Sequence, residues 1–265
     1  MPNMSMPPPL YDVKLIIKKN HHYYLLGDDS TWHQGVTGIL DVISKYALLP
    51  WTAKVTSEYI IKILRKVQGK NVSERFYQTL QKRAKKQSRF IKEAAGRIGT
   101  CAHERFDKFI KEGIPLVKNS PYETSFNYWL KNEKLIIIQG DTKVGSKIYS
   151  YGGSLDAVAM DEYGNFWIID FKTGKNIYDS YAYQLGAYGQ AFMETYGLEK
   201  FPNGVVVRFD PEKEKFERRE IYYMKASFDT FIDAKNILDA QKQEQFSKIE
   251  KSEDKNEKNK NLLKI

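Results

Sequence analysis

The chain has 265 residues, of which 42% are hydrophobic, so it is long enough to bury a sizeable core as one large domain or two small ones. Its net charge of +9 favours a polyanionic partner such as nucleic acid. A single cysteine, Cys101, excludes an internal disulfide and a cysteine-ligated iron–sulfur cluster, and no apolar run is long enough to span a bilayer. These features predict an intracellular protein without a membrane partner.

The first half of the chain predicts a short hairpin followed by helices. Residues 1–10 are Pro-rich and predict a flexible arm, and alternating apolar residues predict a hairpin over 11–27. From about Thr37 to Lys131, apolar residues recur at helical spacing. The predicted helical segments are 38–46, 51–68, 73–95, 99–112 and 122–132.

Positive charge is concentrated in this helical region. Residues 52–100 hold thirteen Lys or Arg and three Glu, a local net charge of +10. Such a stretch is either a set of solvated helix faces or a cationic wall that follows a phosphate backbone. The concentration of positive charge in so few residues favours the cationic wall.

The second half predicts strands around one helix. Strand-like runs cover 134–140, 148–160 and 165–172, and two more cover 204–209 and 216–223. A helix is predicted from Ser180 to Tyr196, with Gly197 as its C-terminal stop. Ser227 is the predicted cap of a last helix that ends near Gln245. The Lys/Glu/Asn-rich tail, residues 246–265, is predicted to be disordered.

The two middle strands bring charged side chains together. If the turn over 161–165 is centred on Tyr163, Asp156 lies directly opposite Asp170 in a hairpin. Side chains repeat every second residue along a strand, so Asp170 and Lys172 share a face. The spacing therefore predicts two carboxylates and one ammonium on one patch of sheet.

Two carboxylates this close repel each other, and a bound hard cation such as Mg²⁺ resolves the conflict. Lys172 would then orient or deprotonate a metal-bound water for attack on a phosphodiester. The alternative is a surface hairpin whose Asp and Lys side chains only form ion pairs. That alternative leaves the second aspartate, the apolar strand FWIIDF and the close-approach glycines Gly152 and Gly153 unexplained.

These residues also form a recognisable set of motifs. GGSLD, which contains Asp156, and IIDFKTGK, which contains Asp170 and Lys172, resemble the G-x-x-D and D-F-K-T-G pattern of RecB-type PD-(D/E)XK nucleases. Gly99-Thr-Cys-Ala-His103 resembles that family's G-T-x-x-H motif, and Gln184-Leu-Gly-Ala-Tyr188 its Q-x-x-x-Y motif. The segment from Val36 to Trp51 is similar to phage and mitochondrial genome-maintenance relatives.

The resemblance implies a restriction-endonuclease-like α/β core, with a central mixed sheet flanked by helices and a mainly helical N-terminal region. The expected division is an arm at 1–10, a hairpin and basic helical region at 11–133, a nuclease core at 134–245 and a tail at 246–265. Mg²⁺ is the implied metal, with Mn²⁺ as a substitute and no iron–sulfur cluster.

The resemblance also implies roles for individual residues. Asp156, Asp170, Lys172, Gln184 and Tyr188 would be catalytic, with Gln184 bonding a phosphate or ordering the metal site and Tyr188 contacting the sugar-phosphate chain. The expected metal ligands are His103, Asp156, Asp170, the backbone carbonyl of Phe171 and Asp141, which stands where relatives carry a glutamate.

The expected function is metal-dependent exonuclease action on single-stranded or frayed DNA ends in replication, recombination or repair. A structure-specific or nonspecific endonuclease and a non-catalytic DNA-binding accessory protein are the alternatives. No P-loop occurs in the sequence, so any unwinding would come from a partner such as a helicase, alongside a recombinase or single-strand-binding protein. The expected location is the cytoplasm, that of the host for a phage protein, or else the mitochondrial matrix.

Overall fold

An eight-stranded mixed sheet forms the centre of the computed structural model, which describes residues 5–19, 21–117, 120–212 and 215–262. The strands follow the order β1-β2-β3-β5-β6-β7-β8, and β4 pairs with β5. Their bounds are β1 Val13–Lys18, β2 His21–Leu26, β3 His33–Gly35, β4 Ile136–Ser146, β5 Tyr151–Met160, β6 Phe166–Lys172, β7 Asn203–Asp210 and β8 Lys215–Ile221.

The sheet forks at the middle of β5. β4 runs antiparallel along β5 from residue 151 to 160 and occupies one of its edges. β3 pairs in parallel with residues 151–152, and β6 pairs antiparallel with residues 157–160, so both must use the other edge. Within the described strands, residues 153–156 have no ladder partner on that edge, and β6 diverges from β5 there to continue along β7.

The predicted register of the central hairpin is confirmed. Met160 pairs with Phe166, and the ladder continues to Ala157 opposite Ile169, which is the register that sets Asp156 across from Asp170. The turn is held by Asp161, whose Oδ1 accepts hydrogen bonds from the backbone N–H groups of Tyr163 and Asn165 at 3.0 and 2.9 Å.

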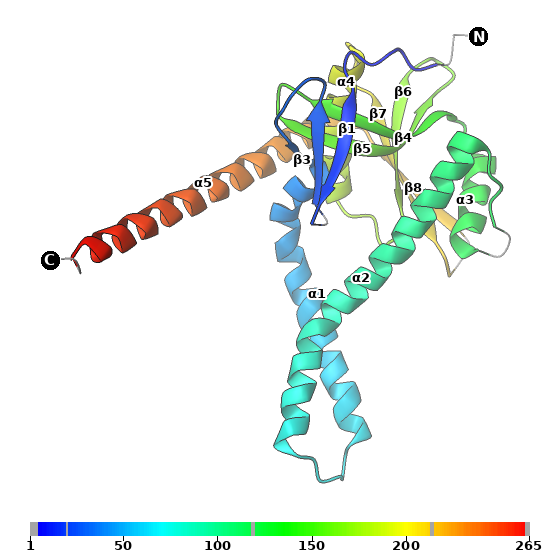
Figure 1. The fold of residues 1–265 in the computed structure, drawn as a ribbon. Helices are drawn as coiled ribbons and strands as arrows, with labels where there is room; N and C mark the ends of the chain where they lie inside the picture. The colour runs from blue at the N-terminus through cyan, green and yellow to red at the C-terminus, as the bar shows by residue number, and fades with distance from the viewer. Residues whose placement is uncertain (1–4, 20, 118–119, 213–214, 263–265) are drawn as a thin grey trace.

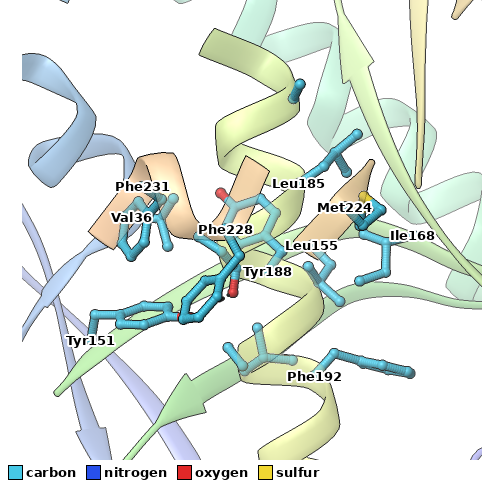
Figure 2. Packing of buried hydrophobic residues seen from close by; sticks show 14 of the residues in the cluster. Val36, Tyr151, Leu155, Ile168, Leu185, Tyr188, Phe192, Met224, Phe228 and Phe231 are labelled. Carbon is cyan, nitrogen blue, oxygen red and sulfur yellow. Dashed lines mark hydrogen bonds between the residues drawn. The ribbon is translucent and has the colours of Figure 1, made fainter. Parts of the chain in front are cut away.

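Helices cover both faces of this sheet (Figure 1). One face packs against α4, the start of α5 and the start of α1, and Figure 2 shows Leu155, Leu185 and Phe228 in that core. The other face packs against α3 and the end of α2, where the rings of Phe106 and Phe126 stack 4.2 Å apart. The helices are α1 Val36–Lys66, α2 Glu74–Glu112, α3 Pro121–Asn132, α4 Ser180–Tyr196 and α5 Met224–Leu262.

The N-terminal helices are longer than predicted. The segments 38–46 and 51–68 are one helix, α1, which continues through Pro50, and 73–95 and 99–112 are one helix, α2. Proline and glycine signal breaks in a sequence, but packing elsewhere along a long helix outweighs their local cost. Together α1 and α2 form a hairpin that projects far from the sheet (Figure 1), which we call the helical arm.

The last helix also differs from the prediction at both ends. α5 begins at Met224 rather than after a cap at Ser227, whose N–H already donates to the Tyr223 carbonyl at 2.9 Å. It does not end near Gln245 but continues to Leu262 and points away from the body (Figure 1), so the structure describes residues 246–262, where a disordered tail is predicted, as helix. Lysine and glutamate, frequent in this segment, are good helix formers. Residues 263–265 lie outside the described residues.

Three further details concern the ends of elements. The predicted helix over 180–196 is confirmed, and Gly197 ends it in the left-handed conformation with φ of 65°. β3, only three residues long, was not predicted. In the predicted arm, residues 1–4 lie outside the described residues, whereas Leu10 N donates to the Thr195 carbonyl at 2.7 Å and Met6 packs on the core.

Candidate active site

Asp170 and Lys172 form the centre of the site at the end of β6. Asp170 is 2% exposed, and the Lys172 Nζ lies 2.8 Å from each of its carboxylate oxygens. The Oδ1 contact is a hydrogen bond, whereas within the described residues Oδ2 receives no hydrogen bond. A buried carboxylate oxygen without a donor is costly, and it is suited to a cation.

Asp156 occupies the fork in the sheet. Its Oδ2 accepts a hydrogen bond from the Phe171 N–H at 2.7 Å, a donor that a continued β5–β6 ladder would have paired with a backbone carbonyl. In an extended strand the N–H and C=O of one residue leave the same edge, so the Phe171 carbonyl also faces this fork. The fork thus presents two carboxylates and one carbonyl.

His103 reaches this fork from α2. Its Nδ1 lies 3.0 Å from Asp156 Oδ1, and its ring packs edge-on against Phe171. The predicted G-T-x-x-H segment does not open a helix, because it lies well inside α2. It nevertheless brings His103 to the site as expected.

The protonation of the site follows from burial and from these pairs. Burial raises the pKa of Asp170 to about 6, with Lys172 opposing the rise and the charge of Asp156 adding to it. Burial also acts to raise the pKa of Asp156, but the charge and hydrogen bond of His103 hold it below the usual value. The two aspartates therefore ionise in different pH ranges.

Both basic groups of the site have raised pKa values. Burial opposes the charge of Lys172, but Asp170 and Asp156 outweigh it and raise its pKa. Burial likewise lowers and Asp156 raises the pKa of His103, with a net rise. Lys172 is therefore an ammonium at neutral pH.

Gln184 and Tyr188 on α4 form the support for Lys172. The Lys172 Nζ donates to Gln184 Oε1 at 3.1 Å, and Gln184 Nε2 donates to the Tyr188 hydroxyl at 2.9 Å. Tyr188 is 5% exposed, so it is not placed to contact a sugar-phosphate chain. Both residues lie at the predicted site, but in this geometry they orient Lys172. The ring centroid of Tyr181 also lies 4.5 Å from the Lys172 Nζ.

Asp141 forms its ion pairs with lysines of its own, Lys143 and Lys111. It has a left-handed φ of 38°, and its carboxylate pairs with Lys143 and with Lys111 at 3.0 Å. The sequence carried no signal for this backbone conformation. The predicted ligand therefore pairs with two lysines, and its place in β4 between Gly140 and Thr142, which pair with Ala157 and Leu155, puts it across from Asp156.

The glycines of the motifs allow close packing. A Cβ at Gly99 would lie 2.9 Å from Thr173 Oγ1, so this glycine lets α2 approach the residue after Lys172. At Gly152 and Gly153 a Cβ would collide with the rings of Tyr24 and Tyr188. The close approach predicted there is thus made by aromatic side chains.

The donor set fits a hard divalent cation. Among the residues that the structure describes, no three His, Cys, Asp or Glu side chains converge as a complete metal cage. Mg²⁺ is commonly bound by one or two carboxylates and keeps several waters. The carboxylates of Asp156 and Asp170, the latter with an Oδ2 that accepts no hydrogen bond within the described residues, and the Phe171 carbonyl match that requirement.

Comparison with known proteins decides the family. A model described as the PD-(D/E)XK nuclease superfamily matches residues 61–261, most of the chain. The chain belongs to this superfamily. Its sheet with flanking helices is consistent with the restriction-endonuclease-like α/β fold, as predicted. PD-(D/E)XK nucleases generally use divalent metal ions, which agrees with the donor set at the fork.

Solved structures add distant similarities. "LHK-Exo in complex with dAMP" is 13% identical, with a TM-score of 0.33 over 82% of this chain and 94% of that one. SSO0001 is 17% identical, with a TM-score of 0.30 over 70% and 86%. An alkaline exonuclease (LHK-Exo) from Laribacter hongkongensis in a second structure is 12% identical, with a TM-score of 0.27 over 55% and 85%. No curated protein matches the chain significantly. In the described part of this PD-(D/E)XK protein, no helix is long and apolar enough to cross a membrane.

Proposed function

We propose that this PD-(D/E)XK protein is a Mg²⁺-dependent deoxyribonuclease that removes nucleotides from single-stranded or frayed DNA ends. The observation that carries the proposal is the fork at Asp156, where the buried Asp170 keeps an oxygen, Oδ2, that accepts no hydrogen bond within the described residues and lies 2.8 Å from the Lys172 ammonium. Two carboxylates at one fork repel each other, and a bound hard cation resolves that repulsion.

Asp156, Asp170 and the Phe171 carbonyl would hold the metal. Mg²⁺, or Mn²⁺ in its place, would polarise the scissile phosphate and stabilise the leaving oxygen. His103 donates to Asp156 and so orients that carboxylate, in the way that outer hydrogen bonds orient metal ligands. Direct ligation by His103 would use its other ring nitrogen, Nε2, because Nδ1 is bonded to Asp156.

Lys172 would act on the attacking water as a cation. Its Nζ is fixed by Asp170, Gln184 and the Tyr181 ring, so its position is determined before substrate arrives. Because its pKa is raised, the ammonium is suited to orient the water and to stabilise developing negative charge.

The helical arm supports a nucleic-acid substrate. Lys82, Lys85 and Lys86 on α2 are exposed, and α2 runs without a break from this basic segment to His103. Beside the site, Tyr178 is 52% exposed and its ring lies 5.6 Å from that of Tyr181, so these two can stack on unpaired bases. Because an intact duplex leaves no base free to stack, single strands or frayed ends are the favoured substrate.

A comparison of linear and circular single-stranded DNA, with Mg²⁺ and with excess chelator, tests the proposal. We expect metal-dependent release of nucleotides from the linear form and resistance of the circular form. Lys172→Ala is the control for contaminating nucleases, because it should keep the fold and lose cleavage. Equal cleavage of both forms would establish an endonuclease, and metal-dependent DNA binding without cleavage would establish an accessory protein.

The proposed activity also indicates a biological process and a cellular location. Such an enzyme would act in DNA replication, recombination or repair, in the cytoplasm of a cell or phage host. Within the sequence no ATPase motif supplies unwinding, so a helicase, recombinase or single-strand-binding protein would provide its substrate.

A further inference from the structure

A pocket of about 320 Å³ lies beyond the fork, between the β2–β3 connection and α5. Its volume falls within the range of about 300–1,000 Å³ that is usual for small-molecule sites. Neither Asp156 nor Asp170 lines it, so it is separate from the proposed catalytic site. The lining residues used below are Tyr23, Trp32, Gln34, Ile39, Lys235 and Lys242.

One wall of the pocket is aromatic. Trp32 is 45% exposed, and its ring centroid lies 6.1 Å from that of Tyr23 at a tilt of 44°. Lys18 places its Nζ 4.8 Å from the Trp32 centroid. An exposed tryptophan beside a second ring and a cation is a platform on which a flat, unpaired base can stack.

The opposite wall carries cations. Lys242 donates to Gln34 Oε1 at 2.7 Å, and Lys235 pairs with Asp239 at 2.6 Å. Lys242 is further from Asp239, at 3.8 Å, and its side chain is 47% exposed. Two lysines around one carboxylate leave a net positive charge, which suits a phosphate.

The pocket and the catalytic fork lie along one strand. Gln34 pairs with Tyr151 at the start of β5, and Asp156 follows five residues later. At about 3.3 Å per residue, these two positions are about 16 Å apart along β5. Ile39 and α5 pack on the face of the sheet that α4, with Gln184, also covers. A single strand that is bound at the fork can therefore reach the pocket if it is long enough to cover this distance.

We infer that this pocket is a second nucleotide-binding subsite. It holds one unpaired nucleotide of the substrate strand, with the base on Trp32 and Tyr23 and the phosphate at Lys242. The inference rests on the proposed DNA substrate. It adds an anchor at a distance from the reacting bond, so it affects long single strands and leaves short ones unaffected.

Equilibrium binding of the full-length protein to fluorescent single-stranded oligonucleotides tests this subsite. Excess chelator prevents cleavage, and lengths of about 4 and about 16 nucleotides cover the usual single-strand site sizes. Trp32→Ala should weaken binding of the long strand by about fivefold or more, because one stacked base contributes at least that much. Binding of the short strand should not change. Trp32→Leu keeps apolar bulk against Tyr23 and should show the same loss.

A charge variant gives an independent signature. Lys242→Gln should reduce the log–log salt slope for the long strand by about 0.7, the contribution of one phosphate contact. Trp32→Ala should leave that slope unchanged, because stacking releases no counterion.

Matched controls lie at the β5–β6 turn, at the other end of the hairpin. Tyr163→Ala removes an aromatic that is 81% exposed, and Lys200→Gln removes a lysine that, like Lys242, donates to a side-chain amide at 2.7 Å. Neither control should change binding.

Several results would overturn the inference. Wild-type affinity for the long strand in the Trp32 and Lys242 variants would do so, as would equal losses for both lengths. If the protein cleaves DNA while these variants bind normally, the subsite alone is refuted. If the wild-type chain binds neither length, the proposed DNA substrate and the subsite are refuted together.

Discussion

Asp170 is the residue at which stability and function oppose each other. Its folded pKa is raised to about 6, against about 3.9 in an unfolded chain. The folded protein therefore binds this proton more tightly than the unfolded chain does. The resulting stability is fully present below a pH of about 4 and is lost as pH rises through about 6. Metal binding has to compensate for the ionised carboxylate at neutral pH.

Asp170→Asn should separate these two effects. We expect nuclease activity to fall by at least about a thousandfold, because several kcal/mol of metal-borne stabilisation are lost. In excess chelator, the variant should gain stability relative to wild type between about pH 4 and about pH 8, by up to about 3 kcal/mol. Urea unfolding at the two pH values measures this gain. Added Mg²⁺ should stabilise wild type and not the variant. A stability difference that does not change with pH would contradict the assignment.

His103 contacts Asp156, and in the proposed role it would act through that carboxylate, so its removal should be milder. His103→Ala leaves the Asp156 carboxylate without its partner at 3.0 Å, and we expect metal affinity or activity to fall by about 10–100-fold with the fold retained. Mg²⁺ titration of activity and circular dichroism check both parts. His22, which is exposed, supplies the control: His22→Ala should change neither quantity. Unchanged turnover in the His103 variant would make it a packing residue.

At the scale of elements, the contact between α2 and Thr173, the residue just after β6, links the helical arm to the site. Gly99 allows that contact because a Cβ would lie 2.9 Å from Thr173 Oγ1. Gly99→Ala should lower activity by at least about tenfold, since displacement of a site by about 1 Å is enough for such losses. Gly96→Ala is the control, because that position has open space around it. It should raise stability by up to about 1 kcal/mol and leave activity unchanged.

A second change in the Gly99 variant distinguishes a clash of the new Cβ with Thr173 from an effect of alanine on α2 itself. Thr173→Ala removes the Oγ1 atom and should restore much of the activity of Gly99→Ala. Nucleotide-release rates of the single and double variants measure this coupling. If the double variant is as impaired as Gly99→Ala, the loss does not come from this contact.

The sequence predicted the elements that local pattern determines. Alternation and the Asp161 turn determine the β5–β6 register, and the helical period with Gly197 determines α4. Separate helical segments were predicted on either side of 47–50 and of 96–98, where the helices continue, because long-range packing overrides local propensity. β3 is too short to carry a period of its own.

The site shows the same division between local and long-range effects. Asp156, Asp170 and Lys172 follow from strand period and turn position, so spacing alone brings them together. The burial of Tyr188 depends on Gly153, a residue on another element, and the ring of Tyr181 lies against Lys172 only in the folded chain. The left-handed backbone of Asp141 has no sequence signature either, and it determines which lysines Asp141 meets.

At the scale of the whole molecule, the end of α5 extends away from the sheet and the site (Figure 1). Deleting residues 247–265 should therefore leave activity on short DNA intact and lower the melting temperature little, since the segment has few apolar residues to pack. Thermal unfolding and nucleotide release of the truncated chain check this. A collapse of solubility or of the melting temperature would show that the helix end has a structural partner.

The helical arm is the other large projection, and its charge should determine binding rather than chemistry. Lys82, Lys85 and Lys86 are exposed on α2. Changing all three to Gln should weaken single-strand binding and reduce the log–log salt slope by up to about 2, at about 0.7 per phosphate contact. Melting temperature should not change, because exposed charges contribute little to stability.

A matched triple variant separates local contact from net charge. Lys131, Lys134 and Lys215 are equally exposed but lie on α3, just after it and on β8, so their change to Gln removes the same charge away from the arm. Long-range attraction by net charge would weaken binding equally in both triple variants. Direct phosphate contact by the arm predicts a reduced salt slope only in the variant at residues 82, 85 and 86. Equal slopes in the two variants would mean that the arm does not follow the phosphate chain, and that its charge only attracts DNA from a distance.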